Sequence, residues 1–345
     1  MRNRDHSDGG RLHHRLKVFA ERVADDSPLY AKLAAAAVED PIAHDILGDA
    51  RRSQPAANMI LAAVQYLLLE GKGERLARFY PALAGAGPPE GDPVPIFLAF
   101  IEEHQEVLRE LVAANAVQTN EVRRCTALVP SFAAAMGPEP MALIEIGPSA
   151  GLNLLYDRYR YHYGPVEVGD PASPVILTTR VEAGDPPLPD PLPDAVWRTG
   201  IDLDPVDISD PSRVRWLRSL LWPESLERIA RFEAAVEVAS AEPPQLVKGS
   251  ALEELTGVAT SAPDGARLVV FHSYVLNQFT PGDREALGEV LTGISRLRPL
   301  DRIGMEMLDP DVHHAGITLT RYRNGAVAEA ALGEAHHHGE WLRWA

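Results

Sequence analysis

Hydrophobic residues in the first part of the chain recur at steps of three and four positions, which is the spacing of one face of an α-helix. Leu16, Phe19 and Val23 share such a face, and the most regular spacing runs over residues 97–112. No strand-like alternation interrupts this pattern. We therefore expect residues 1–138 to form an all-helical N-terminal domain or cap.

Short apolar runs that alternate with helical segments replace this pattern from residue 139 onward. The alternation predicts an α/β domain over residues 139–345, with a Rossmann-like, mainly parallel sheet and a site at the carboxyl ends of its strands. A turn at Gly169-Asp170-Pro171 and then five prolines in 184–194 indicate a β-hairpin and Pro-rich insertion near 164–194. The expected strands are 141–146, 195–201, 267–271 and 302–307, with a further strand and loop within 245–255.

The first of these strands leads into the small-residue loop Gly147-Pro148-Ser149-Ala150-Gly151, and helical spacing resumes over Asn153–Tyr163. A strand, loop and helix in this order present backbone N–H groups to a ligand. A phosphate-binding P-loop is excluded because the loop has no Lys. A dinucleotide fingerprint is excluded because its second and third glycine positions hold Ser149 and Leu152.

A third pattern fits better. Glu145, Gly147 and Gly151, with Ser149 in place of a central glycine, resemble the acidic-x-Gly-x-Gly-x-Gly pattern that opens the S-adenosylmethionine site of class I methyltransferases. The alternative is a strand-to-helix turn whose small residues serve packing alone. On the methyltransferase hypothesis, these four residues and Asn153 hold the methionine end of S-adenosylmethionine.

Further along the chain, other residues match roles in the same hypothesis. Asp202 or Asp204 follows a strand and would hold the ribose, although a solvated acidic turn is the plain alternative. Ser250 and Ala251 would flank the adenine. The best general base is His272, whose alternative role is that of a buried, hydrogen-bonded histidine. Weaker catalytic candidates are Asn277 and Glu306.

The net charge of the chain limits the classes of partner that it is expected to bind. The 345 residues carry a formal net charge of −16, which argues against nucleic acid and against an anionic membrane surface. No apolar run is long enough for a transmembrane helix, and the first ten residues lack the apolar core of a signal peptide. A single cysteine, Cys125, excludes an intramolecular disulfide. We expect a cytoplasmic protein, with self-association left open.

Two other chemistries use residues of the same chain. Gly147-Pro148-Ser149-Ala150-Gly151 also fits the nucleophile elbow of serine hydrolases, with Asp309 and His338 later in the expected order. A metal site is disfavoured. The adjacent pairs His13-His14 and His313-His314 would point to opposite faces of a strand, and His336 and His338, which could share a face, have no third ligand at a diagnostic spacing. A nucleoside-binding or regulatory protein without turnover is the remaining alternative.

The whole pattern resembles a bacterial family catalogued as a domain of unknown function, DUF2332. The resemblance rests on Val117–Arg124, Glu145–Tyr163, Val270–Phe279 and Thr318–Trp344. It implies a methyltransferase-like sheet with a helical N-terminal extension. It also favours a cleft-facing role over simple helix capping for Gln118–Arg124, the polar block before the sheet. We therefore expect an unidentified small-molecule or protein acceptor to meet Gln118, Asn120, Glu121, Arg124 and His338.

Overall fold

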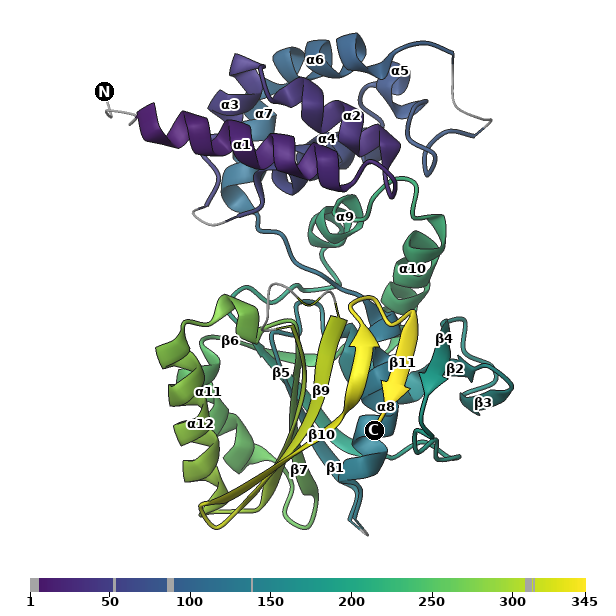
Figure 1. The fold of residues 1–345 in the computed structure, drawn as a ribbon, viewed down its shortest axis with the longest axis vertical. Helices are drawn as coiled ribbons and strands as arrows, with labels where there is room; N and C mark the ends of the chain where they lie inside the picture. Colours follow the sequence, from purple (N-terminus) through teal and green to yellow (C-terminus); the bar gives the residue numbers. More distant parts are fainter. Residues whose placement is uncertain (1–5, 52–53, 86–89, 138, 308–311, 313) are drawn as a thin grey trace. The chain divides into compact units, whose positions relative to one another are not determined.

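The computed structural model describes residues 6–51, 54–85, 90–137, 139–307, 312 and 314–345. It divides the chain into two compact units (Figure 1). The first combines Met1–Thr119 with Asp210–Ala230, and the second combines Asn120–Ser209 with Arg231–Ala345. The structure thus separates the units after Thr119 instead of near residue 138, and it adds a later segment of the chain to the helical unit.

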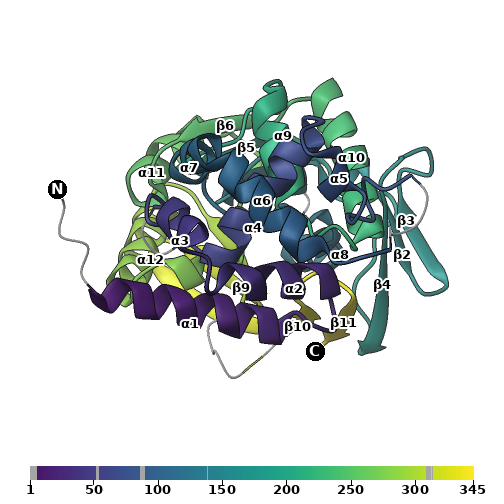
Figure 2. The ribbon, with the colours of Figure 1, turned by 90° about the horizontal axis from the view of Figure 1, so that it is seen from above.

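The first unit is helical, as its periodicity predicts, and its first two helices lie side by side (Figures 1 and 2). The expected long helix over residues 97–112 is two helices that meet at His104, whose ring lies 4.4 Å from that of Phe100. Asp40 and Asp92 cap α3 and α6 through their side chains. The helices are α1 (His6–Arg22), α2 (Pro28–Ala37), α3 (Pro41–Leu47), α4 (Ala56–Leu69), α5 (Glu74–Ala77), α6 (Pro93–Glu103), α7 (Gln105–Ala114) and α9 (Pro211–Ser219).

Helix α4 is the centre of this unit and explains why a distant segment belongs to it. Nearly every α4 residue from Ala56 to Leu68 is buried, so the helix needs neighbours on all sides. One neighbour is α9, whose Trp216 is 2% exposed and belongs to the same core cluster. The Gln65 amide of α4 donates to the Leu221 carbonyl at 2.8 Å, which satisfies a polar group inside this core.

The second unit is built on an eleven-stranded sheet with the order β3-β2-β4-β11-β10-β9-β8-β7-β1-β5-β6. Five strands, from β8 to β6 in this order, are mutually parallel, and β9, β10 and β11 continue the sheet in antiparallel fashion. The sheet is therefore mixed, and the expected parallel part is its core. The strands are β1 (Met141–Ile146), β2 (Arg160–Tyr163), β3 (Val166–Gly169), β4 (Ile176–Ala183), β5 (Ala195–Asp202), β6 (Gln245–Lys248), β7 (Arg267–Ser273), β8 (Leu300–Glu306), β9 (His314–Arg323), β10 (Ala326–His336) and β11 (Trp341–Trp344).

Helices cover both faces of the parallel core. One face carries α11 (Ala251–Ser261) and α12 (Pro281–Ser295), which pack side by side over the even-numbered residues of β1 and β7, such as Ile146 and Val270 (Figure 1). The other face carries α8 (Cys125–Ala135), whose Phe132 ring lies 5.2 Å from that of Phe271. The remaining elements are helix α10 (Leu226–Ala241) and the short 3₁₀ helices η1 (Val122–Arg124), η2 (Leu152–Arg158) and η3 (Leu276–Gln278).

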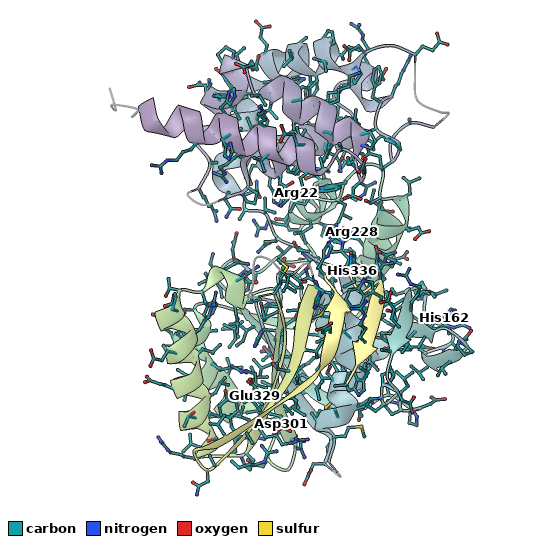
Figure 3. The ribbon with its side chains drawn as sticks, viewed as in Figure 1. Arg22, His162, Arg228, Asp301, Glu329 and His336 are labelled. Atoms are coloured by element: carbon teal, nitrogen blue, oxygen red, sulfur yellow. The ribbon has the colours of Figure 1, made fainter. Side chains whose placement is uncertain are left out.

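A buried carboxylate ties three strands of the sheet together. Asp301 of β8, 0% exposed, accepts hydrogen bonds from Arg267 Nε of β7 at 2.8 Å and from Arg323 Nη2 of β9 at 2.7 Å (Figure 3). Two cations that donate to one buried carboxylate compensate for its lost hydration. This pairing fixes β8 between its parallel and antiparallel neighbours.

The expected helix over Asn153–Tyr163 is wrong. The segment forms the 3₁₀ helix η2 and then strand β2, in which Tyr161 and Tyr163 are buried while Arg160 and His162 are partly exposed. The period of two in this Tyr-Arg-Tyr-His-Tyr stretch is the pattern of a strand. The tyrosine hydroxyls donate to backbone carbonyls, such as Tyr159 to Leu152 at 2.7 Å. These tyrosines therefore contribute to the packing of the unit.

The sequence predicts a terminal antiparallel pair of strands over residues 317–323 and 340–344, but the C-terminal strands pair differently. β9 and β10 form an antiparallel hairpin around Asn324-Gly325, whose φ angles of 50° and 84° suit a tight hairpin turn. β11 then pairs with β10, not with β9. Adjacent strands of a meander pair in chain order, and the sequence analysis overlooked the small-residue strand β10 because its Ala-rich pattern lacks apolar alternation.

Candidate ligand-binding site

The candidate site lies where β1 and β7 end beside each other. From β1 the parallel core continues to β5 and β6 on one side, and to β7 and β8 on the other. In open α/β sheets, the crevice outside such a point of reversal is where ligands bind. The loops that follow the two strands touch here, because a Cβ added to Gly147 would come within 2.5 Å of Val275 Cγ2.

The loop after β1 has a left-handed backbone at alternate positions. Gly147, Ser149 and Gly151 have φ angles of 68°, 53° and 72°. At Gly151 a Cβ would also lie 2.7 Å from Pro244 Cγ, so glycine is needed for space as well as for conformation. Ser149 thus adopts a left-handed backbone angle that glycine tolerates better than other residues.

Two side chains from outside the loop hold it in place. The Asp202 carboxylate at the end of β5 accepts from the Ser149 N–H at 2.8 Å and from the Asp204 N–H at 2.8 Å. The Asn120 amide donates to Ser149 Oγ at 2.9 Å and accepts from the Ala150 N–H at 3.2 Å. Asp202 therefore shapes the loop, whereas Asp204 is half-buried one step further along the turn.

Glu145 lies beneath the loop, 1% exposed, on the face of the sheet that α8 covers. Its Oε1 accepts from Asn153 Nδ2 at 3.2 Å, and its Oε2 has no partner among the described residues. Burial raises the pKa of the Glu145 carboxyl to about 8, and the nearby Asp202 charge adds to this, while Asn153 and Arg124 oppose it. Cys125 donates to Asn153 Oδ1 at 3.3 Å, which fixes the amide from the other side.

The polar block before α8 lies against this loop through Asn120, and the predicted contact of Asn120 with an acceptor stays a prediction. Glu121, 2% exposed, pairs with Arg231 of α10 at 3.6 Å. The Arg124 guanidinium, 5% exposed at the residue level, lies 4.4 Å from the centre of the Tyr274 ring and donates to the Ser273 carbonyl at 3.3 Å. Gln118 belongs to the helical unit, and its predicted contact with an acceptor stays a prediction.

His272 and Glu306 form a buried pair on the opposite face of the sheet. His272, 1% exposed, has its Nδ1 2.7 Å from Glu306 Oε1, and the Glu306 carboxylate also accepts from the backbone N–H groups of Val275 and Leu276. In register, His272 pairs with Ile146 and not with Glu145, which places it on the α11/α12 side. The pair positions the loop after β7, and a role of His272 as base stays a prediction.

Three further predicted residues have local structural roles or none that is visible. Ser250 is the N-cap of α11 and accepts from the Leu252 N–H at 3.3 Å, while Ala251 is buried in the first turn. Asn277 lies exposed on η3. Their adenine-binding and catalytic roles stay predictions. Asp309, the acid of the hydrolase alternative, lies outside the described residues.

The histidine-rich turn after β10 packs on the polar block. The His338 carbonyl accepts from Arg123 Nε at 2.7 Å, and the His337 carbonyl accepts from Arg124 Nε at 3.0 Å. At Gly339, with φ 74°, a Cβ would come within 2.3 Å of the Arg123 carbonyl oxygen. Desolvation lowers the pKa of His336, labelled in Figure 3. Within the described ranges, no group of three or more His, Cys, Asp or Glu side chains could hold a metal ion.

Sequence reasoning missed two residues of the cluster. Tyr274 has φ 57° and lies under the Arg124 guanidinium, and Cys125 bonds the amide that contacts Glu145. Neither contact has a local signal, because each joins segments far apart in the chain. The position of Tyr274 directly after a predicted core strand was the one available indication.

These observations define an α/β protein with a large mixed sheet, a helical unit and a cluster of buried polar groups at the reversal of strand order. A family model described as "Uncharacterized protein conserved in bacteria (DUF2332)" matches residues 13–344. The match spans nearly the whole chain, and the protein belongs to this family. A search of curated proteins gave no match. None of the helices in the described ranges is long and apolar enough to cross a membrane.

Proposed function

We propose that the protein binds S-adenosylmethionine at the Gly147–Gly151 loop and transfers its methyl group to an acceptor. The observation that carries the proposal is the buried Glu145 oxygen that has no partner among the described residues, directly below a left-handed loop at the reversal of strand order. Numbered along the chain, the parallel strands have the order 3-2-1-4-5, which is the order of doubly wound sheets that bind nucleotides. This order supports a Rossmann-like, methyltransferase-type core.

The residues of the site divide into those that shape it and those that would meet the ligand. Asp202 and Asn120 already hold the loop through their hydrogen bonds, so we assign them to positioning. Glu145 would meet the methionine ammonium group, and Asp204 would meet the ribose hydroxyls. Bound S-adenosylmethionine supplies an activated methyl group, and the protein contributes mainly alignment of the acceptor with it.

The first test is thermal unfolding with and without S-adenosylhomocysteine. Ligand at a hundred times its dissociation constant adds about 2.7 kcal/mol of stability to a protein that binds it when folded. We expect a shift in the wild type that decreases in Asp204→Asn. Asp207→Asn is the control, because it removes the same charge at an exposed position three residues further along the chain. No shift in the wild type at millimolar ligand would refute the proposal.

Ser149 supports a second candidate function. A left-handed serine in Gly-x-Ser-x-Gly between a strand and a helical turn is the backbone of a nucleophile elbow. Its hydroxyl is nevertheless held by Asn120, and the residue is only 4% exposed. A fluorophosphonate probe decides: labelling that disappears in Ser149→Ala would establish a hydrolase. Ligand binding without methyl transfer to any acceptor would instead indicate a nucleoside-binding regulator.

A further inference from the structure

The Glu145 carboxyl is placed where an ionised acid is costly. It is 1% exposed and receives one hydrogen bond, from Asn153, while Oε2 has no partner among the described residues. A buried carboxylate needs several donors or a cation to replace its hydration. The described part of the chain forms no ion pair with it. The raised pKa, about 8, agrees with a carboxyl that is mainly neutral at pH 7.

The charged groups around Glu145 are committed elsewhere. From η1, Arg124 is directed to the Ser273 carbonyl, the His337 carbonyl and the Tyr274 ring. From β5, Asp202 adds a like charge and accepts two backbone N–H groups. From α8 and the end of η2 come the buried, weakly acidic groups of Cys125 and Tyr159, whose own pKa values are raised by burial. Among these groups, Arg124 is the cation whose charge favours an ionised Glu145, and it offsets only part of the effect of burial.

We propose that Glu145 exchanges its proton for the primary ammonium group of the ligand. In the empty protein the carboxyl keeps its proton. When the ligand binds, the O–H bond of the carboxyl breaks, the proton leaves to solvent, and the ammonium group pairs with the carboxylate. This inference rests on the proposed function, since it assigns the ammonium group of S-adenosylmethionine to Glu145.

The exchange makes binding depend on pH and on the ammonium group. Below pH 8, a decrease of one pH unit lowers the ionised fraction of Glu145 nearly tenfold. The affinity for the ligand should therefore fall up to tenfold when the pH is lowered from 7 to 6. Adenosine, which has no ammonium group, should bind without proton release and without this slope.

Titration calorimetry of the full chain with S-adenosylhomocysteine tests the inference. At pH 6.5, in two buffers with different ionisation enthalpies, the wild type should release close to one proton for each ligand bound. Glu145→Gln keeps the shape of the neutral carboxyl and should release none. Glu237→Gln, which removes an exposed acid from α10, should behave as the wild type.

The outcomes separate the two proposals. Binding of S-adenosylhomocysteine with no proton release would overturn the exchange and leave the proposed function standing. Absence of binding in both buffers would overturn the proposed function and the exchange with it. If Glu145→Gln does not fold, the wild type decides alone, because equal proton release with adenosine and with S-adenosylhomocysteine would also contradict the exchange.

Discussion

Ser149 and Tyr274 adopt left-handed backbone angles in the loops that follow the neighbouring strands β1 and β7. A left-handed non-glycine residue is strained unless its surroundings hold it, and such residues gather at functional sites. The third such residue in the described ranges, Asn324, lies in a hairpin turn where asparagine is well tolerated. The two strained residues are held by Asp202 and by Arg124, so the polar cluster maintains an otherwise unfavourable conformation.

Glu145 makes a prediction about stability that needs no ligand. Its pKa is raised from 4.5 to about 8, so the folded protein binds more protons than the unfolded chain between these values. Stability from this residue is therefore greatest at low pH and is lost as pH rises toward 8. Glu145→Gln should remove that loss, and its melting temperature relative to the wild type should increase from pH 5 to pH 8.

The measurement is a series of thermal unfolding curves across this pH range, each monitored by circular dichroism. The free energy of unfolding of the variant relative to that of the wild type should change by a few kcal/mol at most over this range, as expected for the upward shift of the Glu145 pKa. Glu237→Gln, at an exposed position, should follow the wild type at every pH. A constant difference between Glu145→Gln and wild type would contradict a neutral buried carboxyl.

At the scale of elements, the turn between β10 and β11 is fastened to η1 by close backbone contact. Gly339→Ala should loosen this turn, because a Cβ would lie 2.3 Å from the Arg123 carbonyl oxygen. Gly265→Ala is a matched control with a similar φ of 82° and no atom within 4 Å. The control should cost about 1 kcal/mol from backbone strain, and Gly339→Ala clearly more.

Thermal unfolding compares the two variants, and hydrogen exchange over residues 120–124 locates the effect. Exchange there should accelerate in Gly339→Ala, since Arg123 and Arg124 lose carbonyl partners in the turn. Equal melting temperatures for the two variants would mean that the turn moves aside without cost.

Elements were predictable from the sequence where the signal is local. Thr280-Pro281-Gly282-Asp283 is a local signal for a helix start, and Thr280 does form a capping box with Asp283. β1 and β7 lie where short apolar runs predicted them. The Tyr-rich strand was missed because periods of two and of 3.6 are hard to separate over five residues. In the site, the sequence indicated the polar residues around Asn120 but not the contact of Asn120 with the loop, which joins segments far apart in the chain. The separation of His272 from Glu145 follows from strand register, which the sequence does not reveal.

At the scale of the whole molecule, the helical unit is discontinuous in sequence. Along the sequence, residues 210–230 belong to the helical unit again after the segment that contains strands β1 to β5 of the other unit. Trp216 donates to the Ala116 carbonyl at 2.8 Å, and Glu224 accepts from Ser27 Oγ at 2.6 Å and from the Leu29 N–H at 3.0 Å. Apolar periodicity could not predict this, because it identifies which residues are buried but not which distant segment buries them.

This arrangement predicts that residues 1–119 do not fold properly alone. Without α9, the Tyr66 side of α4 loses the Trp216 ring, and Gln65 loses its carbonyl partners, which leaves apolar surface and a polar group uncovered. We expect this fragment to bind the dye ANS and to lack near-UV circular dichroism, as expanded, loosely packed states do. The same fragment joined to residues 210–230 by a flexible Gly/Ser linker should bind little ANS and regain the near-UV signal. If both fragments bound ANS equally and gave the same near-UV signal, residues 1–119 would pack without residues 210–230, which would contradict the prediction.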